Sequence, residues 1–371
     1  MSILDYRLAR AVLAGVFILF PAWYILLPTF DHFGQVGETF LPPIIASGKI
    51  DWKDGTGGSR ESGSGSFPLI TKFFGINYFD TTFTSASIVF SPSSNGYDAL
   101  ARWQVFHFLM DLGPVYVVWM LEGLRRGNGG LLGIVLATTG LFVAQLVTLG
   151  LAGPLFYSLH YVFGTSARGL KNNKHQRTIK RDYVPALLPL TLGLHYAVVF
   201  LAYFSPDHSE RHWWIWAWQP APLFIAVLDV VLSNTALRLP GLSGIKNSRL
   251  FSASTLLVTV GIISLVSWTA VLWKAPYSVR QLFVPAAPWA ATKNLVLLSR
   301  ELLQLDFLAS FGSTFAWLMG LFLDMYAADI ITGAELATAV FSIPVASLVG
   351  GPGVALLTGW WWRETKLAKV D

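Results

Sequence analysis

Long apolar runs constrain this chain more than any other feature of its sequence. About 20 mostly apolar residues are enough for a helix to cross a bilayer, and runs of this kind recur along the whole chain. Since a helix satisfies its own backbone polar groups in lipid, we predict an all-α, polytopic integral membrane helical bundle. About eight spans are expected, at Ala9–Thr29, Leu100–Gly123, Leu131–Leu151, Tyr183–Phe204, Trp213–Leu232, Phe251–Trp273, Phe307–Leu323 and Glu335–Trp361.

The composition supports this class. Hydrophobic residues make up 54% of the 371 residues and charged residues 13%, about half the charged share of an ordinary soluble domain. The absence of cysteine excludes disulfides and thiolate metal sites. The net charge of +5 comes mostly from Lys and Arg between apolar runs, a pattern typical of membrane flanks rather than of nucleic-acid binding. If the chain crosses the membrane at each of the eight spans, these charges are divided almost evenly between the two sides of the membrane. The orientation of the chain therefore stays open.

Two regions depart from the pattern of simple spans. Residues Asp51–Ser66 are rich in Gly and Ser and predict a flexible polar surface loop within a single membrane domain, residues 1–371. The third apolar run continues past Gly153 and Pro154 to Phe163. That run is too long for one upright span and too short for two, so we expect a kinked helix. The first run lacks a convincing cleavage site and predicts a retained anchor.

The second span carries an unusual set of polar side chains. Ionisable groups inside a span cost roughly 2.5–3.5 kcal/mol each on insertion scales, which makes each one a candidate functional group. At 100° per residue, four polar positions share one narrow face: Gln104, His107, Asp111 and Glu122. This stripe either faces a cavity, or it connects helices through Asp111 and His107 while Glu122 meets Arg125 or Arg126 at the boundary.

The fifth span combines aromatic and polar residues. Trp216 and Trp218 belong to a tryptophan cluster that precedes Gln219 and Asp229. The cluster is either an interfacial belt or a set of π faces that stabilise a cation. Asp229 lies 11 residues beyond Trp218 and therefore shares its face.

Two histidines in apolar runs each precede a tyrosine. His160 stands before Tyr161, and His195 stands before Tyr196. Each histidine is either a hydrogen-bonded structural residue or part of a site. Asp306 and Asp324 flank the seventh predicted span and are expected at the water boundary.

Several catalytic motifs are absent from the sequence. It contains no DDxxD, NDxxD or DxDD motif, no GxxxxGK[ST] and no HExxH. The first two hold a diphosphate through Mg²⁺, and the last two bind a nucleotide phosphate and zinc. These absences argue against diphosphate-dependent prenyl transfer and against a metalloprotease. We predict no metal and no cofactor.

Three short blocks resemble a known family. They are VVWMLEGLRRGN (Val117–Asn128), GPLFYSLHYVF (Gly153–Phe163) and WAWQPAPLF (Trp216–Phe224). These blocks are similar to fungal membrane-bound terpene cyclases of ascofuranone, ascochlorin and macrophorin biosynthesis, a part of secondary metabolism. The Gly/Ser-rich insert and Gly164–Ala167, where relatives are expected to carry Ser-Pro, depart from the family and leave the substrate open.

The resemblance implies an enzyme that protonates an epoxide or alkene of a farnesylated aromatic or polyketide molecule and cyclises its prenyl chain, without metal or diphosphate release. It implies a lipophilic prenylated substrate that enters from membrane lipid, no obligate protein partner, and a location in the endoplasmic reticulum. A carboxyl in an apolar cavity is suited to donate a proton. The expected catalytic residues are Asp111, Glu122, Asp229 and His107, and the expected substrate-binding residues are Gln104, His160, His195, Tyr196, Trp216, Trp218 and Gln219.

Two other functions stay open from the sequence. A membrane isomerase of the sterol double-bond type uses the same acid and aromatic groups, and substrate shape alone separates it from a cyclase. A transporter or structural membrane protein is the alternative outside enzymes. A transporter is expected to show two halves with matching broken helices, and the proline pairs at Pro185/Pro189 and Pro220/Pro222 do not match in that way.

Overall fold

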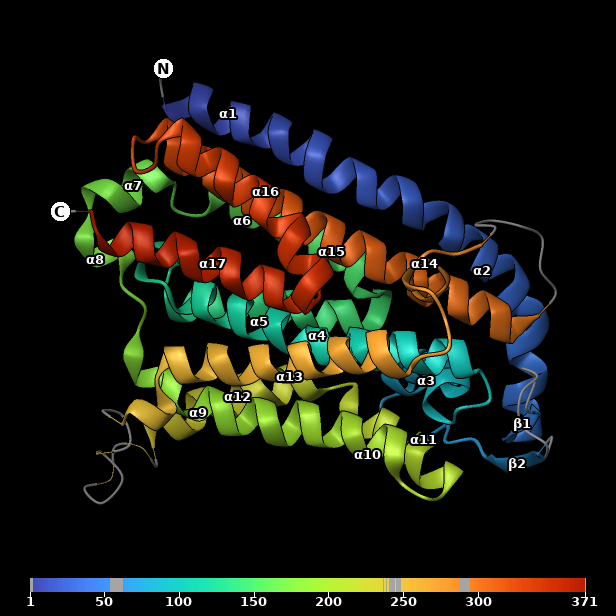
Figure 1. The fold of residues 1–371 in the computed structure, drawn as a ribbon. Coiled ribbons are helices and arrows are strands. Elements are labelled where there is room, and N and C mark those ends of the chain that lie inside the picture. The colour runs from blue at the N-terminus through green and yellow to red at the C-terminus, as the bar shows by residue number, and fades with distance from the viewer. Residues whose placement is uncertain are drawn as a thin grey trace.

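A computed structural model describes residues 3–53, 63–235, 248–286 and 294–370, together with positions 237, 239 and 244. The described chain is almost entirely helical, which confirms the predicted all-helical class. Its long helices lie side by side along one axis (Figure 1). The elements are α1 (Ile3–Leu13), η1 (Ala14–Leu19), α2 (Phe20–Ser47), β1 (Lys49–Lys53), β2 (Ser64–Pro68), α3 (Asn77–Ser94), α4 (Ala99–Leu124), η2 (Arg126–Asn128), α5 (Leu131–Val147), α6 (Leu149–Phe163), α7 (Ala167–Asn172), α8 (Lys174–Arg177), η3 (Arg181–Tyr183), α9 (Val184–Leu190), η4 (Thr191–Ala197), α10 (Val198–Phe204), α11 (His208–Trp218), α12 (Ala221–Asn234), η7 (Arg249–Phe251), α13 (Ala253–Lys274), α14 (Val279–Phe283), α15 (Leu295–Ala327), α16 (Gly333–Gly350) and α17 (Pro352–Ala368).

Among the described residues, six helices are long and apolar enough to cross a membrane. A seventh span is added if the pair α11 and α12, bent by 54°, counts as one. The expected number was about eight. The two expected spans that are not among the six are the third, which is divided between α5 and α6, and the fifth, which is the bent pair α11 and α12. The six are Tyr6–Gln35, Ala99–Leu124, Arg181–Phe204, Ala253–Lys274, Leu295–Ala327 and Gly333–Gly350.

The third apolar run is a helical hairpin, so the predicted kinked helix is wrong. α5 and α6 run in opposite directions (Figure 1), and Gly140 on α5 faces Phe156 on α6 closely enough that a Cβ would lie 3.0 Å from the ring. The chain reverses at Thr148, whose φ of 80° lies in the left-handed region. A β-branched residue rarely adopts that conformation, so a turn at this position is not expected from the residue type.

The eighth predicted span, Glu335–Trp361, is also a hairpin. α16 and α17 run in opposite directions (Figure 1), and an ion pair between Glu335 and Lys366 joins their far ends. Gly351 makes the turn with a φ of 89°, and Pro352 follows at the first helical position, which suits proline. The Gly-Gly-Pro-Gly sequence at 350–353 was the available signal for this reversal.

Part of the predicted flexible loop is ordered as a β-hairpin. β1 pairs with β2 in an antiparallel register that places Lys53 opposite Ser64. Ile50 and Phe67 are both 3% exposed, so each strand buries an apolar side chain that the Gly/Ser-rich composition concealed. The middle of the predicted loop, residues 54–62, lies outside the described residues.

The start of α3 is fixed by an aspartate. Asp80 accepts hydrogen bonds from the backbone N–H groups of Phe74, Phe73 and Gly75, over 2.8–3.1 Å. These bonds lower the pKa of Asp80, because each favours the charged carboxylate. The turn at 73–75 is thereby attached to the helix that lines the cavity described below.

The α5–α6 hairpin decides which charged loops share an end of the molecule. Because it returns the chain, α7 and α8 lie at the end where α1 begins and α17 finishes (Figure 1). We call this the basic end. It carries Arg7, Arg10, Arg125, Arg126, Arg168, Lys171, Lys174, Arg177, Lys180, Arg181, Arg249, Arg363, Lys366 and Lys369. The described part of the opposite end carries Lys49, Lys53, Lys72, Arg102, Arg211, Lys274, Arg280 and Arg300.

This asymmetry predicts the orientation of the inserted chain. The positive-inside rule places the basic end in the cytoplasm. An N-glycosylation acceptor inserted after Lys171 is expected to stay unmodified in microsomes, whereas one inserted between Lys53 and Gly63 is expected to be glycosylated. A gel-shift assay with glycosidase treatment measures both, and the reverse pattern would contradict the prediction.

Candidate functional site

The four residues of the predicted stripe all point into the bundle. Each is at most 1% exposed on α4. Gln104 donates to the carbonyl of Leu303 on α15, and its own carbonyl oxygen has no partner among the described residues. Because α4 is buried on nearly every face from Gln104 to Leu124, the burial of these four residues does not show what the stripe does.

Asp111 joins three helices. Its carboxylate accepts a hydrogen bond from Ser264 Oγ on α13 at 2.6 Å and from the backbone N–H of Gly353 on α17 at 2.9 Å. His107 Nε2 lies 3.3 Å away, and His107 Nδ1 is 2.6 Å from Ser267 Oγ. A Cβ on Gly353 would lie 2.6 Å from Asp111, so α17 packs here only through a glycine. The structure thus places Asp111 and His107 in a helix contact.

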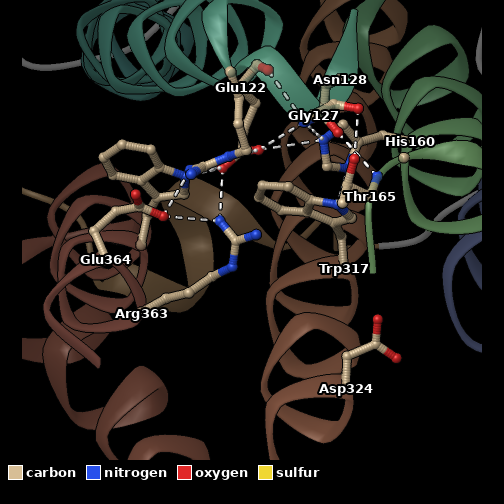
Figure 2. Close-up of polar contacts among 12 residues, drawn as sticks. Glu122, Gly127, Asn128, His160, Thr165, Trp317, Asp324, Arg363 and Glu364 are labelled. Carbon is tan, nitrogen blue, oxygen red and sulfur yellow. Dashed lines mark hydrogen bonds and ion pairs between the residues drawn. The ribbon is translucent and has the colours of Figure 1, made fainter. Parts of the chain in front are cut away.

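Glu122 belongs to an ion-pair network at the basic end (Figure 2). Arg125 binds it through two nitrogens at 2.9 and 3.0 Å. Arg363 and the indole N–H of Trp360, both from α17, donate to Oε1 at 2.7 Å. A buried carboxylate with this many donors is held in its charged form by its partners. Glu122 therefore connects α4 to α17.

His160 and His195 are each fixed by a tryptophan. Trp317 Nε1 donates to His160 Nδ1 at 3.1 Å, and Trp218 Nε1 donates to His195 Nδ1 at 3.0 Å. Since an indole N–H only donates, each Nδ1 is an acceptor, and the ring proton of His195 therefore lies on Nε2. The Nε2 of His160 is 3.1 Å from the side-chain nitrogen of Asn128. The Nε2 of His160 faces Glu122 at 3.4 Å, and that of His195 donates to the carbonyl of Leu109 at 2.8 Å.

Tyr196, like His195, makes a hydrogen bond to the backbone of α4. Pro114 in α4 has no N–H and therefore leaves the carbonyl of Met110 without its helical partner. Tyr196 Oη donates to that carbonyl at 3.2 Å. A Cβ on Gly113 would lie 1.9 Å from the same hydroxyl, so the contact requires glycine. Tyr196, from the π-helix η4, thus compensates for a proline in α4.

The residues of the fifth predicted span divide between core and cavity. Trp216 is fully buried and packs against Phe73 and Phe83. Asp229 is buried on α12, and neither carboxylate oxygen has a hydrogen-bond partner among the described residues. Trp218 and Gln219, at the bend between α11 and α12, line a cavity.

This cavity, which we call the tip cavity, lies at the turn of the α5–α6 hairpin. Its volume is about 400 Å³. Phe108, Leu112 and Trp218 form part of a mostly apolar and aromatic wall, and Val147 at the rim is 39% exposed. The polar side chains on the wall are Thr81, Thr82, Ser85, Tyr116, Gln145, Thr148, Gln219 and Asp306.

Asp306 is the acidic residue of the tip cavity, and sequence reasoning missed it. It was expected at the water boundary, before a span that begins at Phe307. α15 instead begins at Leu295, so Asp306 lies about three turns inside the helix and is 5% exposed. Its Oδ1 accepts the backbone N–H of Gly150, at the start of α6, over 2.5 Å.

A second hollow, the lateral groove, separates the arms of the α5–α6 hairpin. It has a volume of about 510 Å³ and reaches Glu122, Asn128 and His160 at the basic end. Leu136 and Phe163 on its rim are 58% and 68% exposed. The predicted site residues are therefore spread over the Asp111 contact, the Glu122 network, the tip cavity and α12, and the structure does not gather them in one place.

No group of three or more His, Cys, Asp or Glu side chains suited to a metal ion occurs in the part of the chain that the structure describes. No solved structure matches the chain. A model of the CtvD domain matches residues 55–368. The chain belongs to the CtvD domain family.

Curated relatives are similar to this chain over most of its length. It is 27% identical to the FAD-dependent monooxygenase verC1 of Penicillium polonicum, over 84% of this chain and 38% of the relative. It is 28% identical to the FAD-dependent monooxygenase anuJ of Penicillium roqueforti, over 72% and 32%. It is 26% identical to the FAD-dependent monooxygenase BOA8 of Botryotinia fuckeliana, over 69% and 33%. The chain thus spans about a third of the length of these relatives.

These relatives contradict the predicted function. All three are named monooxygenases, so the terpene cyclase predicted from the short blocks is wrong, together with its cyclase, isomerase and lyase classes. The names support neither the sterol-type isomerase nor a transporter any better. The block GPLFYSLHYVF contains His160, which accepts a hydrogen bond from Trp317 and so joins α6 to α15.

The contact of Tyr196 with Gly113 predicts a stability effect. Gly113→Ala is expected to lower the free energy of unfolding by about 1–3 kcal/mol, the usual effect of overpacking, because the new Cβ collides with Tyr196. Gly312→Ala on α15 is the matched control, since a Cβ there meets nothing within 4 Å. Thermal melting followed by tryptophan fluorescence measures both. Equal melting temperatures for the two variants would contradict the prediction.

Proposed function

We propose that this chain is a membrane-embedded substrate-binding protein in the oxidation of a lipophilic secondary metabolite. The observation that carries the proposal is the tip cavity, whose wall is mostly apolar with a few polar groups placed together. That arrangement is typical of small-molecule sites. The six helices with the length and composition of spans favour a molecule that arrives through the lipid. The oxidation comes from the relatives' name, monooxygenase.

The substrate we propose is neutral. Of the side chains that line the tip cavity, Asp306 is the charged one, and no Lys or Arg is among them. An anionic substrate would therefore meet no compensating cation and would lose its hydration. The lipophilic prenylated molecules expected from the sequence fit these limits, as do other uncharged lipophilic metabolites.

The two cavities do not fit the FAD of the relatives. FAD carries a diphosphate, which proteins bind through helix N-termini and basic side chains, commonly after a parallel strand. The lateral groove, like the tip cavity, presents a carboxylate and no Lys or Arg, and the described residues form one antiparallel sheet of two strands. The proposal therefore assigns this chain the binding of substrate and no flavin step. The remaining two-thirds of the relatives' length, or a separate flavoprotein, supplies the oxidation.

The proposal predicts where a lipophilic probe binds. With the protein in lipid nanodiscs, a neutral diazirine alkyl probe is expected to label peptides of α4 and α15 that line the tip cavity, such as those with Phe108 and Leu302. Ala86→Phe fills part of the cavity from its half-buried position on α3, and is expected to reduce this labelling several-fold.

The matched control is Leu136→Phe, in the lateral groove. It is expected to leave labelling of α4 and α15 unchanged. Labelling confined to lipid-facing residues such as Val258 and Phe341, or labelling of the tip cavity that Ala86→Phe does not reduce, would overturn the proposal.

A further inference from the structure

The side-chain amide of Gln219 stands without a partner in the wall of the tip cavity. Gln219 is 1% exposed. Its Nε2 has no hydrogen-bond partner among the described residues, and none of the side-chain bonds of the described chain involves its amide. Burying an unbonded amide in apolar surroundings is costly. Such a group either lowers the stability of the fold or forms its hydrogen bond with a bound molecule.

A second donor lies on the same wall. Tyr116 Oη accepts a hydrogen bond from Gln145 Nε2 at 3.0 Å, and its own proton has no acceptor among the described contacts. The rings of Tyr116 and His195 are 4.9 Å apart, and His195 accepts the N–H of Trp218, the residue before Gln219. Tyr116 and Trp218, both on the surface of the cavity, are therefore joined through the buried His195, and Gln219 follows Trp218 in the chain.

The fixed neighbours keep this surface in place. The Trp218 N–H and the His195 Nε2 proton are both used, in bonds of 3.0 and 2.8 Å. Neither group is left to bind a ligand, and the indole is held in orientation by its bond. The buried donors on the cavity wall without a partner among the described residues are thus Gln219 Nε2, the Tyr116 hydroxyl proton and, at the hairpin turn, Thr148 Oγ1.

From this arrangement we infer that Gln219, with Tyr116, selects a substrate that carries a carbonyl oxygen. An amide N–H and a phenol O–H are both donors, and a carbonyl oxygen accepts from both. A hydrocarbon ligand leaves the amide unpaired, whereas a ketone or ester satisfies it. The inference rests on the proposed function, because it concerns the molecule that occupies the tip cavity. It makes Gln219 a specificity-determining residue.

Two probes of equal length test this inference. Both carry a tritiated alkyl diazirine, and one has a ketone where the other has a methylene. In nanodiscs, the wild-type protein is expected to bind the ketone probe roughly two- to tenfold more tightly in the tip cavity, the range of one net hydrogen bond. Gln219→Met keeps the size and removes the amide while Tyr116 remains, so the preference for the ketone is expected to fall. The double variant Gln219→Met/Tyr116→Phe is expected to bind both probes equally.

A stability measurement separates recognition from a structural role. Without ligand, Gln219→Met is expected to melt at or above the wild-type temperature, because it removes an unpaired buried amide. Thr139→Val in the lateral groove is the control, and it is expected to keep the preference for the ketone. An undiminished ketone preference in Gln219→Met, or equal binding of both probes by the wild type, would overturn the inference and leave the proposed function standing. Failure of either probe to label the cavity would overturn the proposed function itself.

Discussion

One hydrogen bond holds the part of the structure on which the cavity depends. The backbone N–H of Gly150, in the first turn of α6, donates to Asp306 on α15 over 2.5 Å. The first N–H groups of a helix have no partner within it, and in an apolar interior each unpaired group costs several kcal/mol. A carboxylate at this position satisfies the donor and also complements the positive end of the helix. The α5–α6 hairpin can therefore end inside the bundle instead of at its surface.

The close packing around the same turn explains why it is not free to move. A Cβ on Gly150 would lie 2.5 Å from Leu26 and 3.0 Å from Ala309, so the tip is wedged between α2 and α15. Thr148 keeps a left-handed backbone beside this contact. A strained residue persists where its surroundings over-determine it, and such residues cluster at ligand sites. The tip cavity is the space left where the hairpin stops.

Most of the buried polar groups predicted as a site turn out to connect helices. The sequence showed that Asp111, Glu122 and His195 were buried in spans, and the structure agrees. The sequence also offered His107 as a partner of Asp111 and Arg125 as a partner of Glu122, and both pairs are present. It could not show the partners Gly353, Arg363 and Trp218, because these lie in distant elements. Asp306 was misplaced for a related reason. Its flanking residues Glu301 and Gln304 interrupt the apolar run, so hydropathy began the helix about 12 residues too late.

The fold was predictable where one apolar run has the length of one helix. It was not predictable where the chain reverses within an apolar run. α4 lies within one residue of its predicted bounds. The α5–α6 hairpin was missed because an apolar run does not mark a reversal, and Thr148 carries none of the usual turn chemistry. The α16–α17 hairpin was missed although the Gly-Gly-Pro-Gly sequence at 350–353 marks it. Gln219 was among the predicted binding residues and does line the tip cavity. That role remains a proposal.

The reversal at Thr148 is the central claim, and a distance measurement tests it directly. The chain contains no cysteine, so spin labels at Arg126→Cys and Arg168→Cys are the only labels in the protein. In the hairpin, both positions lie at the basic end; Thr165 Oγ1 bonds to the carbonyl of Gly127. Double electron–electron resonance is predicted to give a separation below about 30 Å. A distance near 50 Å, the length of about 33 helical residues at 1.5 Å each, would show a single span and contradict the account.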